Sequence, residues 1–342
     1  MAKKVRTIAD FFAGVGGLSL GFTDAGFRLV LASDNDKWAS TTFRKNHIDV
    51  PFIEKSIEEV TSAELRAAVG DGPIDVLVGG VPCQAFSMAG YRNRESRRDI
   101  VDERVYLFRH YIRVAEILRP KVVVVENVKG LPSMLGGLVL EEMRSELEEL
   151  GYVVDWKILN AADYGAAQLR ERFVLIANRL SVANRFPPPT RTPDQYETVG
   201  SALRDLPSTN HEPRALHGPT LERVRLIKQG ENWRALPEAM QTRSLHSGAY
   251  GRLRSDAPAK TLLTRFDSPP VGYVTHPEED RALTVREGAR LQGFPDAFTF
   301  FGPKMSQYRQ VGNAVSPIMS AAIARSVIQM LDEGEADVKS RV

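Results

Sequence analysis

The chain is poor in cysteine: Cys83 is the only one in 342 residues. A single cysteine excludes an internal disulfide bond and any metal site built from several cysteines, and no metal is expected. No uninterrupted apolar run approaches the roughly 18 residues of a membrane-spanning helix. The start, Met-Ala-Lys-Lys-Val-Arg, leads into a predicted strand without the apolar core of a signal peptide. We therefore expect a cytoplasmic protein that does not bind a membrane.

The chain also lacks a strong net charge, which is formally +2. The charge is unevenly distributed, because residues 165–276 contain sixteen Lys and Arg against ten Asp and Glu, a local excess of six. A mildly basic half suits a polyanionic partner, although alone it is a weak signal. The length is sufficient for two domains with a sizeable core.

Cys83 lies in a loop whose flanks predict more than packing. The run Ile74–Gly79 has the Val, Leu and Ile content of a buried parallel strand. Pro82 fixes its own φ and favours an extended Val81. The thiol therefore follows the carboxyl end of a strand, where open α/β sheets place their chemistry. Most free cysteines are small buried hydrophobic residues, but such a residue needs no Gly-Gly-Val-Pro and Gln-Ala-Phe-Ser flanks. We interpret Cys83 as a nucleophile.

A glycine-rich loop, Ala-Gly-Val-Gly-Gly, follows the first predicted strand, Thr7–Phe12. Its spacing does not fit the dinucleotide-binding pattern, because Ser19 replaces the third glycine, and no P-loop lysine follows. The loop would let the backbone approach a ligand and direct the N–H groups of the helix Leu18–Ala25 at a carboxylate. The methionine part of S-adenosylmethionine supplies such a carboxylate.

Two carboxylates follow predicted strands. Asp34 directly follows the strand Arg28–Ser33, where an acidic residue can accept both hydroxyls of a ribose. Asp36 can cap the next helix. Glu126 follows the strand Lys121–Val125, beside the cysteine strand. There it is placed as a general acid of raised pKa, or alternatively as a cap of the following loop.

Arginines occur in two further patterns. Arg170 and Arg172 would share one face of an extended segment and could grip a phosphate and a base carbonyl, although such a pair is also common on surfaces. The segment 90–102 contains four arginines, Arg97 among them. It is either a solvated loop or a lid that closes on DNA.

Composition changes after Asn184, where prolines interrupt regular structure. We expect a loop-rich lobe over 185–277, in which the stretch around Arg252 presents donors to base edges. Order returns after Arg281, with a helix capped by Thr284 and an apolar helix that ends at Leu331. The remaining residues, 332–342, are polar and expected to form a flexible tail.

Six motifs in this order resemble those of the DNA (cytosine-5) methyltransferase family, over roughly residues 5–331. They are Asp10-Phe11-Phe12-Ala13-Gly14-Val15-Gly16-Gly17, Pro82-Cys83-Gln84, Glu126-Asn127-Val128, Gln168-x-Arg170-x-Arg172, the pair Arg281-x-Leu283-Thr284-x-Arg286-Glu287 and Arg290-Leu291-Gln292-Gly293-Phe294-Pro295, and Gly312-Asn313-Ala314-Val315. The resemblance implies an α/β fold of the S-adenosylmethionine-dependent, Rossmann-like kind, with a mostly parallel twisted sheet and a small loop-rich target-recognition domain. The expected division is a catalytic and cofactor-binding part, 1–184, the recognition domain, 185–277, a return to the catalytic domain, 278–331, and the tail.

The resemblance also implies the roles of individual residues. Cys83 adds to C6 of a cytosine flipped out of the duplex, which makes C5 nucleophilic. Glu126 holds a proton at N3, Asn127 supports that loop, Arg172 contacts O2, and Arg170 contacts the backbone. S-adenosylmethionine, which leaves as S-adenosylhomocysteine, is expected to contact Phe12, Gly14, Gly16, Gly17, Leu18, Asp34, Ser56, Ile57, Asn313 and Val315. Ser56 stands where many relatives have Asp, and Asn35 where many have an aromatic residue. Gln84, Ser87, Arg97 and Arg252 are the expected DNA contacts.

The resemblance leaves alternatives open. One is a tRNA cytosine-5 methyltransferase, against which the sizeable 185–277 lobe argues. Another is a catalytically silent DNA-binding relative, against which Cys83, Glu126 and Arg172 argue. We expect a monomer acting on double-stranded DNA in the nucleoid of a bacterium or a phage host, with a cognate restriction endonuclease as a candidate partner. No code links the recognition lobe to a target sequence.

Overall fold

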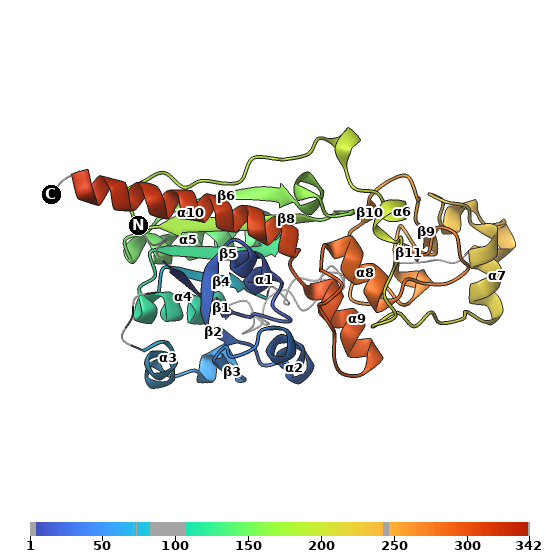
Figure 1. Ribbon diagram of the computed structural model, residues 1–342. Helices are drawn as coiled ribbons and strands as arrows, with labels where there is room; N and C mark the ends of the chain where they lie inside the picture. The colour runs from blue at the N-terminus through green and yellow to red at the C-terminus, as the bar shows by residue number, and fades with distance from the viewer. Residues whose placement is uncertain (1–4, 71, 73, 83–106, 242–245, 341–342) are drawn as a thin grey trace.

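A seven-stranded sheet forms the larger lobe of the computed structural model, which describes residues 5–70, 72, 74–82, 107–241 and 246–340 (Figure 1). In spatial order the strands are β3 (Phe52–Ile53), β2 (Phe27–Ser33), β1 (Arg6–Phe11), β4 (Val76–Gly80), β5 (Val122–Val128), β8 (Glu171–Asn178) and β6 (Val153–Asn160). Strand β8 runs antiparallel to both of its neighbours, and the other pairings are parallel. The predicted α/β fold with a mostly parallel sheet is confirmed.

Helices cover both faces of this sheet. They are α1 (Gly17–Asp24), α2 (Lys37–Asn46), α3 (Ser62–Val69), α4 (Leu107–Leu118), α5 (Leu138–Glu149) and α10 (Pro317–Ser340). Val122 and Val124 of β5 belong to the core formed with α1 and α10, whereas Val123 and Val125 belong to the core formed with α4 and α5. A strand buried on both faces needs apolar residues at every position, and this explains the unbroken valine run.

The smaller lobe is loop-rich, as expected, and lies beyond the carboxyl ends of the parallel strands (Figure 1). Its elements are α6 (Val199–Ala202), α7 (Gly218–Leu226), β9 (Gly251–Arg252), β10 (Ala259–Lys260), β11 (Tyr273–Thr275), α8 (Val285–Gln292) and α9 (Lys304–Asn313). Strand β10 pairs with the short strand β7 (Gln168–Leu169) of the larger lobe, and β11 pairs with β9. The lobe is therefore joined to the sheet by backbone pairing.

The packing differs from the expected division at two places. Residues after Asn184 still lie on the larger lobe, where the Tyr164 hydroxyl donates to the Pro187 carbonyl at 3.0 Å. Helices α8 and α9, expected to return to the catalytic domain, share one core with α6 and β10, and this core also includes Val15 and Ala39 of the larger lobe. Helix α10 packs on the sheet itself, because its apolar side chains complete the core over α1.

Residues 332–340, expected to belong to a flexible tail, continue α10 as helix. Asp332 accepts from Arg6, and Glu333 pairs with Arg185 at 2.7 Å. These two ion pairs anchor the polar end of α10, which the composition predicted to be flexible. By length and composition, the segment Lys304–Asp337 could cross a membrane, but 78% of its apolar window is buried, as in a core helix.

Candidate active site

Glu126 and Arg172 meet at the carboxyl end of the sheet. Glu126 lies opposite Gly80 of β4, and Arg172 lies opposite Val128 of β5. The Nε atom of Arg172 is 2.9 Å from Oε1 of Glu126, and both side chains are close to nine-tenths buried. Burial raises the pKa of the Glu126 carboxyl despite the lowering effect of Arg172 and Arg170. The site therefore holds an acid that can keep its proton nearer neutrality, beside a fixed cation.

Asn127 joins this strand end to the segment that leads to the cysteine. Its Nδ2 donates to the Val81 carbonyl at 2.9 Å, and its Oδ1 accepts from the Val128 backbone N–H at 2.7 Å. Asn127 thereby fixes the backbone two residues before Cys83. Cys83 itself lies outside the described residues, as do three predicted DNA contacts, Gln84, Ser87 and Arg97.

The glycine loop turns between β1 and α1 and faces open space at one point. A Cβ at Gly14 would meet nothing within 4 Å, and the Gly14 N–H donates to Oδ2 of Asp34 at 2.8 Å. Asp34 is partly exposed, and its Oδ1 accepts from Asp36 N–H, so each oxygen keeps a lone pair for a hydroxyl donor. Leu18 is buried in the core, so it can contact a ligand only through its backbone at the helix start.

The C-terminal loop before α10 closes against the same place. A Cβ at Gly17 would lie 2.2 Å from the Val315 carbonyl oxygen. A Cβ at Gly80 would lie 3.5 Å from Oε2 of Glu126 and 3.9 Å from both the Phe12 carbonyl oxygen and Cγ2 of Val315. The structure therefore brings together the glycine loop, the buried carboxylate and the C-terminal loop around Gly80, with the neighbouring Asn313 exposed.

The predicted adenine contacts, Ser56 and Ile57, follow strand β3. The Ser56 hydroxyl donates to Oε2 of Glu58 at 2.7 Å, and the Ile57 side chain is buried in the core beside α4. The Ser56 oxygen keeps its lone pairs in this bond, so it can still accept from an adenine amine. Ile57 could contribute only its backbone.

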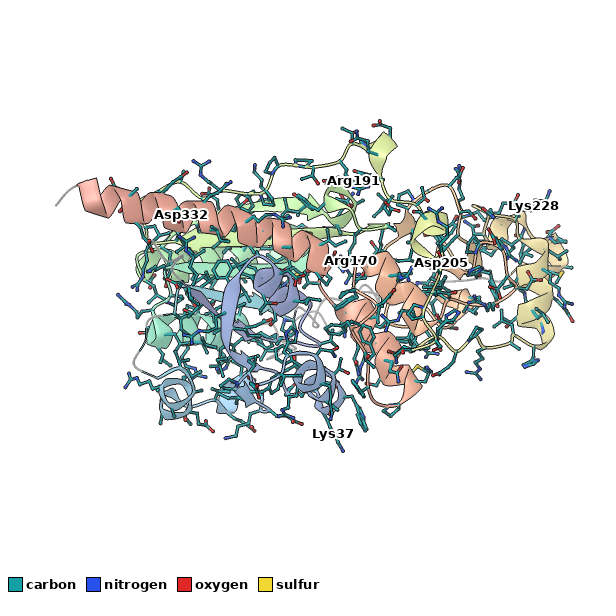
Figure 2. All side chains as sticks on the ribbon, viewed as in Figure 1. Lys37, Arg170, Arg191, Asp205, Lys228 and Asp332 are labelled. Atoms are coloured by element: carbon teal, nitrogen blue, oxygen red, sulfur yellow. The ribbon has the colours of Figure 1, made fainter. Side chains whose placement is uncertain are left out.

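Arg170, which was expected to contact the backbone, donates to backbone carbonyls of the protein itself. Its Nη2 donates to Gly312 at 2.9 Å and Ala314 at 3.0 Å, and its Nη1 donates to Leu262 at 3.3 Å. The side chain is 2% exposed and lies between the two lobes (Figure 2). Arg170 and Arg172 have different tasks, because Arg170 holds the C-terminal loop while Arg172 holds Glu126.

Two glutamines to which the sequence assigned no role extend this network. Nε2 of Gln168 donates to Oε1 of Gln292 at 2.7 Å, and Nε2 of Gln292 donates to Val311 and Ala314 at 3.0 and 2.6 Å. Both glutamines are fully buried. The sequence offered one indication of their importance, because each glutamine lies inside one of the six motifs that resemble the family.

Comparison with known proteins agrees with this geometry. The family model for C-5 cytosine-specific DNA methylases matches residues 6–329. The chain belongs to this family. It is 37% identical to the type II methyltransferase M1.HphI of Haemophilus parahaemolyticus, over 95% of this chain and 87% of that protein. It is 34% identical to the type II methyltransferase M.Eco47II of Escherichia coli, over 97% of this chain and 81% of that protein.

Solved structures of methyltransferases share the fold. A prophage-encoded E. coli protein, solved as a candidate DNA modification methyltransferase, superimposes with a TM-score of 0.75 at 25% identity, over 96% of this chain and 99% of that one. The methyltransferase EhMeth of Entamoeba histolytica superimposes with a TM-score of 0.70 at 17% identity, over 96% of this chain and 99% of that one. At this identity the likeness supports only a shared fold. The chain is therefore a DNA (cytosine-5) methyltransferase.

Arg252 corrects a second prediction for this methylase. The residue was expected to reach DNA, but it is only 6% exposed. Its guanidinium donates to the carbonyls of Val224, Ile227, His276 and Glu279 and to the carboxylate of Asp280. All five N–H groups are used inside the smaller lobe, so none remains for a base.

Two buried titratable groups lie under the glycine loop. Asp10 accepts from the Ser19 hydroxyl at 2.6 Å, while its Oδ1 has no partner among the described residues, and burial raises its pKa to about 7. His47 lies against Gly16, and burial lowers its pKa to about 4. Neither was singled out from sequence, because burial of a short polar side chain is a tertiary property.

Proposed function

We propose that the chain transfers a methyl group from S-adenosylmethionine to C5 of a cytosine flipped out of a specific duplex sequence, through a transient bond between Cys83 and C6. The observation that carries the proposal is the buried Glu126–Arg172 pair at the sheet edge. Asn127 links this edge to the segment that leads to Cys83. An acid and a cation at this edge, together with a thiol two residues after Val81 in the sequence, match the needs of addition to a pyrimidine ring.

The residues would divide the work as follows. The Cys83 thiolate adds to C6, and Glu126 protonates or holds the proton at N3, so that the ring becomes an enamine nucleophilic at C5. Arg172 both keeps Glu126 in place and donates to the ring O2. After methylation, the proton at C5 leaves to a base or water, and the electrons of that C–H bond expel the thiolate from C6.

The residues present fit S-adenosylmethionine at its amino-acid and ribose ends. Its sulfonium supplies an electrophilic methyl group. The open face of Gly14, the N–H groups of Gly17 and Leu18 at the start of α1 and the partly exposed Asp34 support binding of a carboxylate and a ribose. Asn313 and Val315 would close the site from the C-terminal loop.

Trapping tests the covalent step. Bisulfite sequencing of plasmid from expressing cells would first locate the methylated cytosine. A duplex with 5-fluorocytosine at that position should then form a stable conjugate with the protein, because fluoride at C5 cannot leave as a proton does. Since Cys83 is the only cysteine, Cys83→Ala should abolish the conjugate while keeping the fold. An active wild-type protein that forms no conjugate would refute the mechanism.

Duplex DNA is the proposed substrate, in keeping with the family and with the extensive smaller lobe. Competition between duplex DNA and tRNA for methyl transfer distinguishes the tRNA alternative. Methylation by Cys83→Ser at the wild-type rate would contradict the covalent mechanism on either substrate. We further propose a cytoplasmic monomer with a restriction endonuclease as partner, because the similar proteins carry type II names.

A further inference from the structure

The smaller lobe contains two Arg-x-Asp pairs of the same spacing. Nε and Nη2 of Arg254 donate to the two carboxylate oxygens of Asp256 at 2.8 and 2.7 Å. Nε and Nη2 of Arg265 face the two oxygens of Asp267 in the same way, at 3.0 and 3.5 Å. The surroundings differ, because the Asp256 side chain is 69% exposed and the Asp267 side chain only 15%. Asp267 is therefore a fixed support for its arginine.

The second pair borders two cavities. Arg265 borders a cavity of about 320 Å³ between its loop and α9, together with Thr264, Ser306 and Arg309. Arg265 and Asp267 also border a second cavity of about 710 Å³. Arg254 lines neither of these two cavities. The guanidinium of Arg265 thus has room for a ligand beside it.

The loop that carries Arg265 is fixed to the catalytic end of the sheet. Three residues earlier, the Leu262 carbonyl accepts from Arg170 and its N–H donates to Oε1 of Gln168 at 3.0 Å. A Cβ at Gly312 would lie 2.7 Å from both the Leu263 carbonyl oxygen and Cα of Thr264. Arg170 is two residues from Arg172, the partner of Glu126. Arg265 therefore sits at a set position relative to the proposed cytosine pocket.

Three of the cations around these cavities, those nearest α9, are paired with a carboxylate, whereas Arg214 on the outer side of the larger cavity is exposed. Arg265 pairs with Asp267, and Nη2 of Arg309 lies 2.6 Å from Oδ2 of Asp36. Lys304 pairs with Glu212. A phosphate would be attracted by unneutralised charge. Paired cations instead offer directional donors, which suit the edge of a base.

We propose that Arg265, oriented by Asp267, reads a guanine of the recognition sequence in the major groove. The inference rests on the proposed action on duplex DNA. With Nε and one N–H of Nη2 committed to Asp267, the end of the guanidinium keeps N–H groups on Nη1 and Nη2. These form the fork that donates to O6 and N7 of guanine.

Arg265→Ala and the matched control Arg254→Ala test the proposal. Each purified variant would methylate a duplex library randomised around the target cytosine, and methylated sites would be read by bisulfite sequencing. Arg265→Ala should lose its preference for guanine at one position by about 5- to 150-fold, while Arg254→Ala keeps the wild-type pattern. Replacing that guanine with 7-deazaguanine should slow wild type and leave Arg265→Ala unaffected.

Other outcomes refute the inference. A uniform loss at all sequences with a shallower salt dependence would identify a phosphate contact. Unchanged guanine preference in Arg265→Ala, or loss of all activity with an unchanged thermal unfolding curve, would also refute it. Should Arg265→Ala fail to fold, Asp267→Asn must show the weakened guanine preference. A wild-type protein that methylates no duplex would instead refute the proposed function.

Discussion

Arg172 and Glu126 form an ion pair across two antiparallel strands, with 2.9 Å between Nε and Oε1. Their strand positions fix the pair, because β5 and β8 are hydrogen-bonded along their length. Burial nevertheless raises the pKa of Glu126 and lowers that of Arg172. The carboxylate is thus held in position without being locked in its charged form, which is the condition for an acid that must share a proton with a base.

Glu126→Gln should therefore lower single-turnover methylation by about 10²- to 10⁴-fold. The amide keeps the shape and a donor but cannot exchange a proton with N3. The matched control is Glu171→Gln, one residue before Arg172, where an exposed carboxylate pairs with Lys129 at 2.6 Å. The control should retain wild-type rates. A Glu126→Gln rate within tenfold of wild type would contradict the proton-holding role.

Arg170→Lys should destabilise the fold by on the order of 3 kcal/mol, because an ammonium cannot reach the three carbonyls that the guanidinium joins. Urea unfolding measures the loss. The control Arg179→Lys changes an exposed arginine of the same strand region, which donates to Arg119. It should cost well under 1 kcal/mol. Equal losses in the two variants would show that Arg170 does not anchor the C-terminal loop.

The strand ends and the glycine loop could be predicted from the sequence, because they depend on short runs of apolar residues and glycines. The valine run identifies β5, and hence the place of Glu126. Thr284 and Glu287 form the predicted capping box. The burial of Arg170 and Arg252 could not be predicted, since the sequence does not distinguish a buried arginine from an exposed one. Their burial depends on carbonyls from segments up to 144 residues away.

The packing of α8 and α9 could not be predicted for a related reason. Helices α8 and α9 follow the return of regular sequence, and this suggested a return to the sheet. Their core contains Leu262 and Phe266 of the smaller lobe as well as Val15 and Ala39 of the larger lobe. Periodicity shows that a helix has an apolar face but does not show which partner covers it.

Gly17→Ala should weaken both stability and cofactor binding. Its Cβ would lie 2.2 Å from the Val315 carbonyl, and backbone cannot swing away as a side chain can. We expect a loss of about 1–3 kcal/mol in unfolding free energy and weaker binding of S-adenosylhomocysteine in calorimetry. Gly130→Ala is the control, since nothing lies within 4 Å of its Cβ and its φ is −80°. Wild-type affinity in Gly17→Ala would show that Val315 does not close the site.

The two titratable groups under the glycine loop should act on stability in opposite directions. The pKa of Asp10 is raised from 3.8 to about 7 by burial, so the folded state loses stability as pH rises through that window. The pKa of His47 is lowered from 6.5 to about 4, so the folded state loses stability as pH falls through that window. Between pH 4 and 6.5 the two effects oppose each other.

Asp10→Asn should separate them. The amide can still accept from Ser19 but does not ionise, so the unfolding free energy of the variant should gain on that of wild type by about 4 kcal/mol between pH 4 and 8. The variant alone should then weaken below pH 6.5 as His47 becomes protonated on unfolding. Urea titrations across this range measure both slopes, and Asp205→Asn removes an exposed carboxylate of the smaller lobe as the control. Parallel curves for Asp10→Asn and wild type would mean that Asp10 is ionised in the folded protein at neutral pH, and burial would then not hold the proton on this carboxyl.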